Sequence, residues 1–353
     1  MRSSLVMRVM HPGSLALCTL PSLVALLSAC SSAGPQASSL IRISGSSTVF
    51  PVIERAAAAY RLTERGKDVK VELSEVGTSA GLRQFCAGEI PIANASRPIS
   101  SKELKACDGN AISFIELPLA FDALTVVVNS GNTWAKAITT TELARIWGRQ
   151  AQGKITNWRQ VNLDWEDRPL SLCAPGVDSG TFDTFNQAIN GDKANARTDV
   201  TSSEDDNVLV NCVAKAQNAM GYFGFAYYRS NADRLKALPI AQTDGQPVLP
   251  SVETVQNGSY KPLSRPLFLY VNDKQMRADD EIRSFVGFTV SNGLRFVAEA
   301  GYIPLPADTY RIVEAKLYRH ILGTTFGGDL PVGLSFGDAL RRSFDDTRKP
   351  EFR

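Results

Sequence analysis

Histidine is almost absent from this chain of 353 residues, which contains only His11 and His320. A Ser-His-Asp hydrolase needs a histidine beside its nucleophile, and a histidine metal site needs several histidines. The segment 176–180, Gly-Val-Asp-Ser-Gly, also places its serine one position late for the Gly-x-Ser-x-Gly turn of hydrolases. We therefore expect a protein that is not an enzyme and that uses no metal and no cofactor.

Excess charge and long apolar runs are also lacking. The first 29 residues hold two of the 38 basic residues and none of the 36 acidic ones, so 36 of each sign remain beyond them. A chain without excess positive charge lacks the electrostatic footprint of a nucleic-acid-binding surface. Beyond the N-terminus, no apolar run reaches the length of a membrane span, and there are no tandem repeats.

The N-terminus has the features of a secretory signal over residues 1–29: Arg2 and Arg8, an apolar stretch at 15–27, and small residues before Cys30. The sequence Leu-Ser-Ala-Cys at 27–30 resembles the bacterial lipobox, in which cleavage leaves the cysteine as a lipid-bearing N-terminus. An ordinary signal with an incidental cysteine is the alternative. Residues 30–39 are rich in Ser, Ala, Gly and Pro, as in a flexible tether. We expect export to the periplasm or cell surface, with a membrane anchor at Cys30.

The cysteines agree with export. Of the six, one lies in the signal and Cys30 is the lipidation site, which leaves an even set for an oxidising compartment. No Cys-x-x-Cys motif or mixed Cys/His cluster points to zinc. Four cysteines allow three pairings, and their neighbourhood in the chain favours two disulfides over four free thiols. The favoured pairs are Cys86–Cys107 and Cys173–Cys212.

Three segments combine Gly with Ser or Thr just before a helix-like stretch: 44–48 (SGSST), 77–81 (GTSAG) and 178–181 (DSGT). A helix start carries unpaired N–H donors and partial positive charge, which attract anions. Glycine allows close approach, and hydroxyls add neutral donors. One such motif is usually a simple N-cap. Three of them, with Arg97 in reach of one, indicate a receptor for an oxyanion.

Strand-like and helix-like segments alternate along the chain, which is typical of an open α/β sheet with ligands at the carboxyl ends of its strands. Two similar runs, 123–129 and 266–272, both end in Val-Asn. We interpret them as paired hinge strands between two lobes. The expected division is lobe I at 40–128 and 266–320, lobe II at 129–265, and a C-terminal extension at 321–353.

Four strings resemble the substrate-binding lipoproteins of phosphate ABC transporters: 44–51 (SGSSTVFP), 77–98 (GTSAG…ASRP), 177–185 (VDSGTFDTF) and 220–228 (MGYFGFAYY). The resemblance extends from about residue 40 to 310. It implies a type II periplasmic-binding-protein fold, with two α/β lobes joined by two hinge strands. It further implies a monomer that closes on inorganic phosphate between its lobes and delivers it to an ABC transporter permease.

Carried over by position, the resemblance also implies the ligand-binding residues. In well-known members an Asp follows the Ala-Ser of the second string, where this chain has Arg97. Those members also have an Arg four residues before the Ser of the Ser-Gly-Thr in the third string, where this chain has Pro175. The implied phosphate-binding residues are Ser46, Ser47, Thr48, Thr78, Ser79, Arg97, Asp178, Ser179, Gly180 and Thr181, with Asn207 as a weaker candidate.

Selectivity requires one further group. Phosphate near neutral pH carries a proton that sulfate lacks, so a carboxylate acceptor in the site would reject sulfate. Asp178 is the first candidate acceptor, before Asp205, Asp206 and Glu75, although Asp178 could instead cap the helix at Thr181. Arg97 offers a fork for two phosphate oxygens; the alternative is an exposed turn residue.

Other functions stay open at this point. A receptor for sulfate, molybdate or arsenate would use the same kind of motif. An exported phosphoesterase on the same fold is a further alternative, which the scarcity of histidine disfavours.

Overall fold

The computed structural model describes residues 39–242 and 245–328, and all structural statements concern these residues. The expected signal at 1–29, the lipidation site Cys30, residues 30–38 of the tether and residues 329–353 of the C-terminal extension lie outside them. None of the described helices is long and apolar enough to cross a membrane.

The first part of the sheet is a parallel arrangement in which β1 pairs with β2 on one side and β3 on the other. Ile41 and Ile43 of β1 pack with α1, while the other face of the sheet packs with α2 through Ala93. Alternation along the strand therefore buries both faces under helices. The elements are β1 (Leu40–Gly45), α1 (Phe50–Tyr60), β2 (Lys70–Glu75), α2 (Thr78–Cys86) and β3 (Ile92–Ala95).

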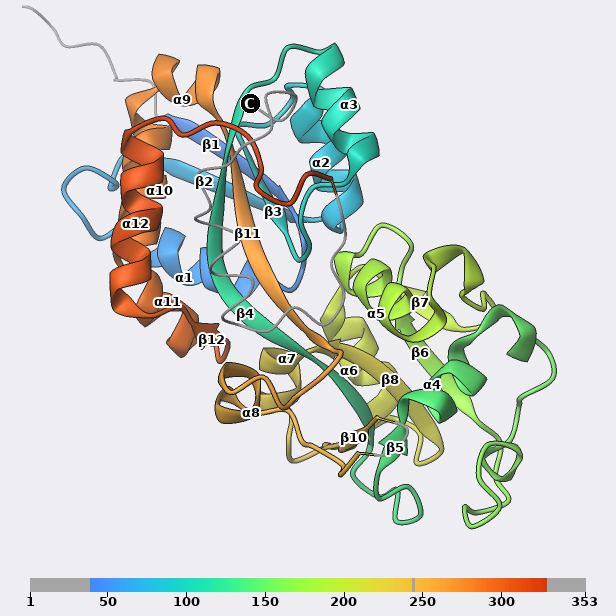
Figure 1. The fold of residues 1–353 in the computed structure, drawn as a ribbon. Coiled ribbons are helices and arrows are strands. Elements are labelled where there is room, and N and C mark those ends of the chain that lie inside the picture. The colour runs from blue at the N-terminus through green and yellow to red at the C-terminus, as the bar shows by residue number, and fades with distance from the viewer. Residues whose placement is uncertain (1–38, 243–244, 329–353) are drawn as a thin grey trace, which may run out of the picture. The chain divides into compact units, whose positions relative to one another are not determined.

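Two long strands carry the chain between two groups of elements. β4 (Phe114–Asn129) pairs antiparallel with β11 (Ser264–Asn272) as far as Ala123, and its next residues pair with β8 (Ala219–Gly224). Figure 1 shows β4 and β11 running side by side along this path. These are the predicted hinge strands, although β4 begins nine residues before the expected position 123. β4 changes its pairing partner after Ala123, within the strand itself. The lobe boundaries at 128/129 and 265/266 stay a prediction.

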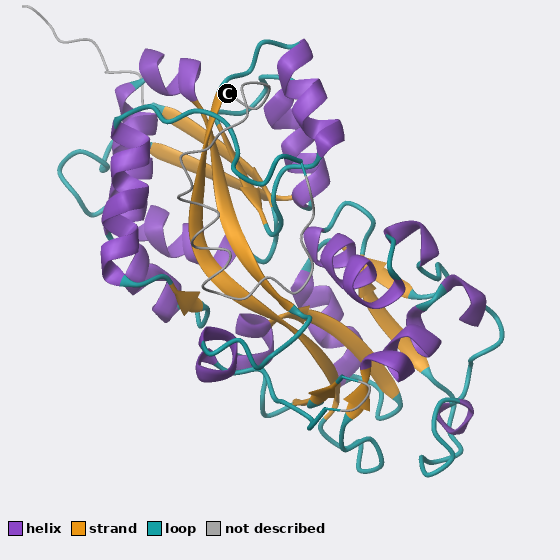
Figure 2. Ribbon diagram, viewed as in Figure 1, coloured by secondary structure: helices purple, strands orange, loops and turns teal. Residues whose placement is uncertain are grey.

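The second group is built on β6 (Ser171–Pro175), β7 (Thr201–Ser203) and β8, with β6 parallel to both neighbours. The helix α5 (Gly180–Asn190) packs on it through Phe185, which stacks on Tyr222 with ring centroids 3.7 Å apart. The helix α6 (Asp206–Ala214) packs through Leu209 and Val213. Strands and helices alternate in both groups (Figure 2), which confirms the predicted α/β fold class.

The remaining elements support these two groups. The chain from Asp280 to Glu299 forms two helices that meet at Asn292. A Cβ at Gly293 would lie 2.3 Å from the Tyr310 ring, so the second helix starts with a glycine. On the β1 side the elements are α3 (Ser101–Gly109), α9 (Asp273–Ala278), α10 (Asp280–Ser291), α11 (Gly293–Glu299), β12 (Ile303–Pro304) and α12 (Ala307–Tyr318). The others are β5 (Ile138–Thr139), α4 (Thr140–Trp147), α7 (Phe225–Arg229), β9 (Leu235–Ala237), β10 (Ile240–Ala241) and α8 (Val252–Gln256), with 3-10 turns at Arg149–Ala151, Trp158–Gln160 and Lys193–Asn195.

Two disulfides fasten the helices. Cys86 at the end of α2 is bonded to Cys107 of α3, and Cys173 of β6 is bonded to Cys212 of α6. Both predicted pairings are confirmed. Each bond closes a loop of modest length, which favours the folded state by restricting the unfolded chain.

Candidate oxyanion-binding site

Each of the three Gly/Ser/Thr motifs lies between the carboxyl end of a strand and the start of a helix. The motifs follow β1, β2 and β6 and precede α1, α2 and α5. Gly45 has a φ of 140°, and a Cβ there would lie 2.1 Å from the carbonyl oxygen of Asn94. Gly77 has a φ of 83°, the left-handed region that favours glycine. The local sequence therefore forms the tight turns that bring helix N-termini together at the strand ends.

The motifs meet across the two groups of elements. The hydroxyls of Thr48 and Thr181 are 3.3 Å apart although the residues are 133 positions apart in the chain. The hydroxyls of Thr78 and Ser96 are 3.2 Å apart. A Cβ at Gly180 would lie 2.5 Å from the Ser96 hydroxyl and 2.7 Å from that of Thr78. The start of α5 is thus seated directly against the first two motifs.

Most of the predicted hydroxyls are shielded from water. Thr78 and Thr181 are fully buried, and Ser46, Ser47, Thr48 and Ser179 are at most 5% exposed. Outside the helix and strand ladders, no hydrogen bond among the described residues uses the backbone N–H of Thr48, Thr78 or Gly180. Buried hydroxyls together with unpaired N–H donors at helix starts form a cradle for an anion.

Arg265 of β11 is a site residue that the sequence analysis missed. Its Nη2 donates to Thr181 Oγ1 at 2.7 Å, to Thr48 Oγ1 at 3.1 Å and to Asp122 Oδ2 at 2.9 Å. The residue is 2% exposed, and its Nη1 has no hydrogen-bond partner among the described residues. A buried guanidinium nitrogen without a partner is costly unless an anion meets it. The sequence does contain a signal for this pair. Arg265 stands directly before the apolar run 266–271, and Asp122 stands between the apolar residues 119–121 and 123–124.

Arg97 lies at the same junction but its contacts differ from those predicted. It is buried, not an exposed turn residue. Its Nε donates to Asp183 of α5 at 2.7 Å, its Nη atoms donate to both carboxylate oxygens of Glu103, and the remaining donors reach the carbonyl of Pro98 and Ser79 Oγ. All five N–H groups have protein acceptors, so this arrangement does not favour the predicted fork around two phosphate oxygens. Arg97 instead orients Ser79 and joins the two groups of elements.

The electrostatics of Arg97 are those of a buried ion network. Burial alone would raise the pKa of Glu103, but the adjacent Arg97 outweighs it and holds this pKa below its ordinary value. The carboxylate therefore stays ionised and accepts charge-assisted hydrogen bonds from the guanidinium. Such a network is expensive to break by removing one member, because the remaining charge is left unpaired in the interior.

Asp178 does not have the surroundings expected of a buried acceptor. Its carboxylate pairs with Arg83 Nη1 at 2.6 Å, and its side chain is 32% exposed. The alternative capping role belongs to Ser179, whose hydroxyl accepts from the N–H of Thr181 at 3.1 Å. The backbone carbonyl of Asp178 accepts from the N–H of Ser79 at 2.8 Å. Asp178 therefore contributes to the contacts between the two groups of elements, which we call the seam.

Asp206, the first residue of α6, has the surroundings that Asp178 lacks. It is 1% exposed, hydrogen-bonds Ser47, and has an Oδ2 without a partner among the described residues. Burial raises the pKa of Asp206 to about 8; Asp122 and Glu75 act in the same direction and Arg265 opposes them. Asp205 caps α6 through the N–H of Asn207, whose side chain is exposed. Neither neighbour is placed like Asp206.

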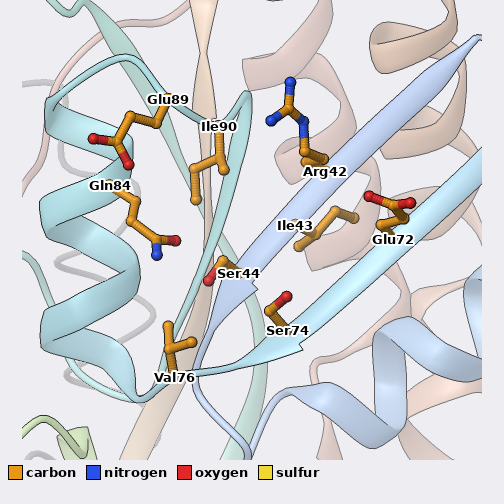
Figure 3. Close-up of a pocket in the computed structure, with 9 residues that line it drawn as sticks. All are labelled: Arg42, Ile43, Ser44, Glu72, Ser74, Val76, Gln84, Glu89 and Ile90. Atoms are coloured by element: carbon orange, nitrogen blue, oxygen red, sulfur yellow. The ribbon is translucent and has the colours of Figure 1, made fainter.

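A separate pocket of about 250 Å³ opens on the sheet beside α2 (Figure 3). It is lined by side chains of β1, β2 and α2 and by Val76, Glu89 and Ile90. The lining contains the two carboxylates of Glu72 and Glu89 and the cation of Arg42. This lining opposes an oxyanion, and none of the motif residues from 46 to 48 or 78 to 81 contributes to it. Among the described residues there is also no cluster of His, Cys, Asp or Glu suited to a metal ion.

Comparison with known proteins gives a consistent set of matches. A family model described as the PBP superfamily domain matches residues 31–292. Protein SphX of Synechococcus elongatus is 46% identical over 302 residues, covering 86% of this chain and 88% of SphX. The phosphate-binding protein PstS of Staphylococcus epidermidis is 34% identical over 267 residues, covering 76% and 79%. A putative phosphate ABC transporter substrate-binding protein of Clostridium perfringens, solved with bound phosphate, is 28% identical with a TM-score of 0.64, covering 76% of this chain and 100% of that one.

Proposed function

The chain belongs to the PBP superfamily and, within it, to the family of the SphX and PstS proteins, and from this we propose that it captures inorganic phosphate outside the cytoplasm and delivers it to an ABC permease. The type II periplasmic-binding-protein fold predicted from the sequence is confirmed. PstS of Staphylococcus epidermidis is a phosphate-binding protein, and within the proposal this chain likewise binds its ligand without catalysing a reaction.

The observation that carries the proposal is the meeting of three helix N-termini, two of which contribute threonines that contact Arg265. Thr48 comes from the first motif, Thr78 from the second, and Gly180 and Thr181 from the third. Motifs one and two precede the β4 hinge strand and motif three follows it, so a ligand between them contacts both lobes. A tetrahedral oxyanion matches hydroxyl and N–H donors that converge from several directions.

Within this proposal, the residues divide into two roles. The hydroxyl or N–H groups of Ser47, Thr48, Thr78, Gly180 and Thr181 bind phosphate together with Arg265, and Ser46, Ser79 and Ser179 complete the surrounding turns. Arg97 and Asp178 form ion pairs between the lobes. Asp206 accepts a hydrogen bond from the protonated oxygen of the ligand. Retention at the membrane through a lipid on Cys30, and action as a monomer, are further parts of the proposal.

Calorimetric titration tests the proposal. The exported protein is stripped of ligand by unfolding, refolded, and titrated with phosphate, then with sulfate, molybdate and arsenate. We expect one phosphate per chain and a rise in melting temperature, because a ligand that binds only the folded state adds about 2.7 kcal/mol at a hundredfold excess over Kd. No heat and no thermal shift with phosphate would refute the proposal, and a stronger response to sulfate or molybdate would reassign the ligand.

A further inference from the structure

Residues 321–328, the described part of the C-terminal extension, contact lobe I at β4, β11 and the start of α3. Gly323 donates its N–H to the carbonyl of Phe114 at 2.8 Å and forms a parallel bridge with Ile115 at the start of β4. Phe326 is 1% exposed and packs edge-on against Phe268 with ring centroids 5.4 Å apart. The segment is therefore an integral part of the lobe I core.

One path of hydrogen bonds leads from this segment to the backbone beside Arg97. Thr324 Oγ1 donates to the fully buried carboxylate of Glu116 at 2.6 Å. The Tyr270 hydroxyl donates to the same carboxylate at 2.9 Å and accepts from the N–H of Ile99 at 2.8 Å. Ile99 is two residues beyond Arg97. Loss of the Thr324 hydroxyl removes one donor from a buried carboxylate and loosens the tyrosine that holds this backbone.

A second path reaches Arg97 through its ion partner. The Gly328 carbonyl accepts from the N–H of Ser101 at 3.1 Å and from its hydroxyl at 3.3 Å. Ser101 is the first residue of α3, and this bond occupies one of the free donors of the helix start. Two residues along the helix, Glu103 closes the capping box with Ser100 and binds both Nη atoms of Arg97.

From these two paths we propose that the 321–328 segment is a positioning element for the binding site, which holds Arg97 so that it orients Ser79 and reaches Asp183 of the opposite lobe. The inference rests on the proposed function, because its main readout is phosphate affinity. The contacts given above join the segment to groups outside the proposed ligand-binding set. It acts through Glu116 and Tyr270 on one side of Arg97 and through α3 on the other.

Two substitutions in the full exported protein separate the paths. Thr324→Val keeps the side-chain shape and removes the donor to Glu116. Gly328→Ala adds a Cβ that would lie 2.4 Å from the Ser101 hydroxyl and 2.8 Å from its backbone, at a φ of 84°. Gly153→Ala is the matched control, since Gly153 has a φ of 65° and no atom within 4 Å of the added Cβ. Thr324→Ser restores the hydroxyl and serves as the rescue.

Phosphate Kd is measured by calorimetry at a temperature at which each variant is folded by circular dichroism. We expect Thr324→Val and Gly328→Ala to bind about five- to tenfold more weakly, as for one lost hydrogen bond at a buried site. Thr324→Ser and Gly153→Ala should retain the Kd of the unsubstituted protein. Folded Thr324→Val and Gly328→Ala proteins with unchanged Kd would overturn the inference.

Hydrogen exchange keeps this test independent of the proposed function. In ligand-free protein, the amides of residues 96–103 should exchange faster in Thr324→Val and Gly328→Ala than in Gly153→Ala. Unchanged exchange overturns the positioning role, whatever the ligand is. Failure of the unsubstituted protein to bind phosphate refutes the proposed function instead, and the exchange comparison then decides on the positioning role alone.

Discussion

At the scale of single residues, the buried charges near the motifs have distinct chemical tasks. Arg265 supplies positive charge beside Thr48 and Thr181, and Asp122 balances it at 2.9 Å. Asp206 carries a carboxyl with one oxygen that has no hydrogen-bond partner in the described part of the chain. Because burial raises its pKa to about 8, the group is protonated below that pH and ionised above it. In the proposed site, the ionised form would accept a hydrogen bond from the protonated oxygen of phosphate and repel sulfate, whereas the protonated form could donate to either anion.

The selectivity of the site should therefore depend on pH. The ratio of phosphate to sulfate affinity should increase as pH rises through about 8, the pKa of Asp206. Asp206→Asn should lower the ratio about tenfold or more above that pH and make it independent of pH, because the amide can donate to sulfate. Competition titrations measure the ratio. Asp178→Asn is the control, and a loss of selectivity there but not in Asp206→Asn would return the acceptor role to Asp178.

Arg265 should be more sensitive to substitution than an exposed arginine. Lysine keeps the charge but loses the planar fork that reaches Asp122, Thr48 and Thr181 together. We expect Arg265→Lys to weaken phosphate binding by about 1–3 kcal/mol, as for buried polar groups left unsatisfied. Arg83→Lys is the control, because the Arg83 side chain is 62% exposed in its ion pair with Asp178. This substitution should change the free energy of phosphate binding by less than about 1 kcal/mol. Equal, small effects in calorimetry would remove Arg265 from the site.

At the scale of elements, the start of α5 is a major contact between the lobes. The helix begins at Gly180, with Ser179 as its N-cap, and Thr181 and Asp183 in its first turn reach Thr48 and Arg97. Gly180 and Thr181 therefore meet the two lobe I motifs, and Asp183 pairs with Arg97 beside them. Glycine at 180 is required by this close approach, since any Cβ would overlap the hydroxyls of Ser96 and Thr78.

Gly180→Ala should accordingly impair closure. The methyl group would lie within 2.7 Å of both hydroxyls, so we expect phosphate affinity to fall by about tenfold or more while the lobes themselves stay folded. Gly191→Ala, at the end of the same helix, is the control: its φ of 75° makes alanine strained, but no atom lies within 4 Å of the new Cβ. It should cost stability without changing Kd. Normal binding by Gly180→Ala would contradict the seated position of α5.

At the scale of the whole described chain, contacts across the seam both favour and oppose closure. Arg97–Asp183 and Arg83–Asp178 are ion pairs of opposite charge. Glu75 of β2, in contrast, comes close to Asp205 of the α6 N-cap. Burial raises the pKa of Glu75 to about 7, and the charges of Asp205 and Glu54 add to this shift.

Glu75 should make the stability of the protein depend on pH. A carboxyl whose pKa is raised by folding stabilises the folded state fully below the ordinary value of 4.5, and this contribution is lost as pH rises through about 7. Thermal denaturation of ligand-free protein should show a melting temperature that falls over this range, and Glu75→Gln should flatten the fall. Glu72→Gln is the control, because Lys70 lowers the pKa of Glu72. The same pH profile in both variants would exclude Glu75 as the cause.

The sequence by itself determined the three turns, the hinge strands and both disulfides. These features are encoded locally: glycine and hydroxyl residues follow a strand and open a helix, and apolar β-branched runs form strands. Tertiary structure alone decided which charged residues meet the turns. Arg265 contacts Thr48 across 217 positions in the chain, and Arg97 contacts Asp183 across 86. Asp178 looked suitable because it lies in a motif, whereas Asp206 is placed by the packing of α6. Burial and charge partners depend on how distant elements pack, and no local spacing records them.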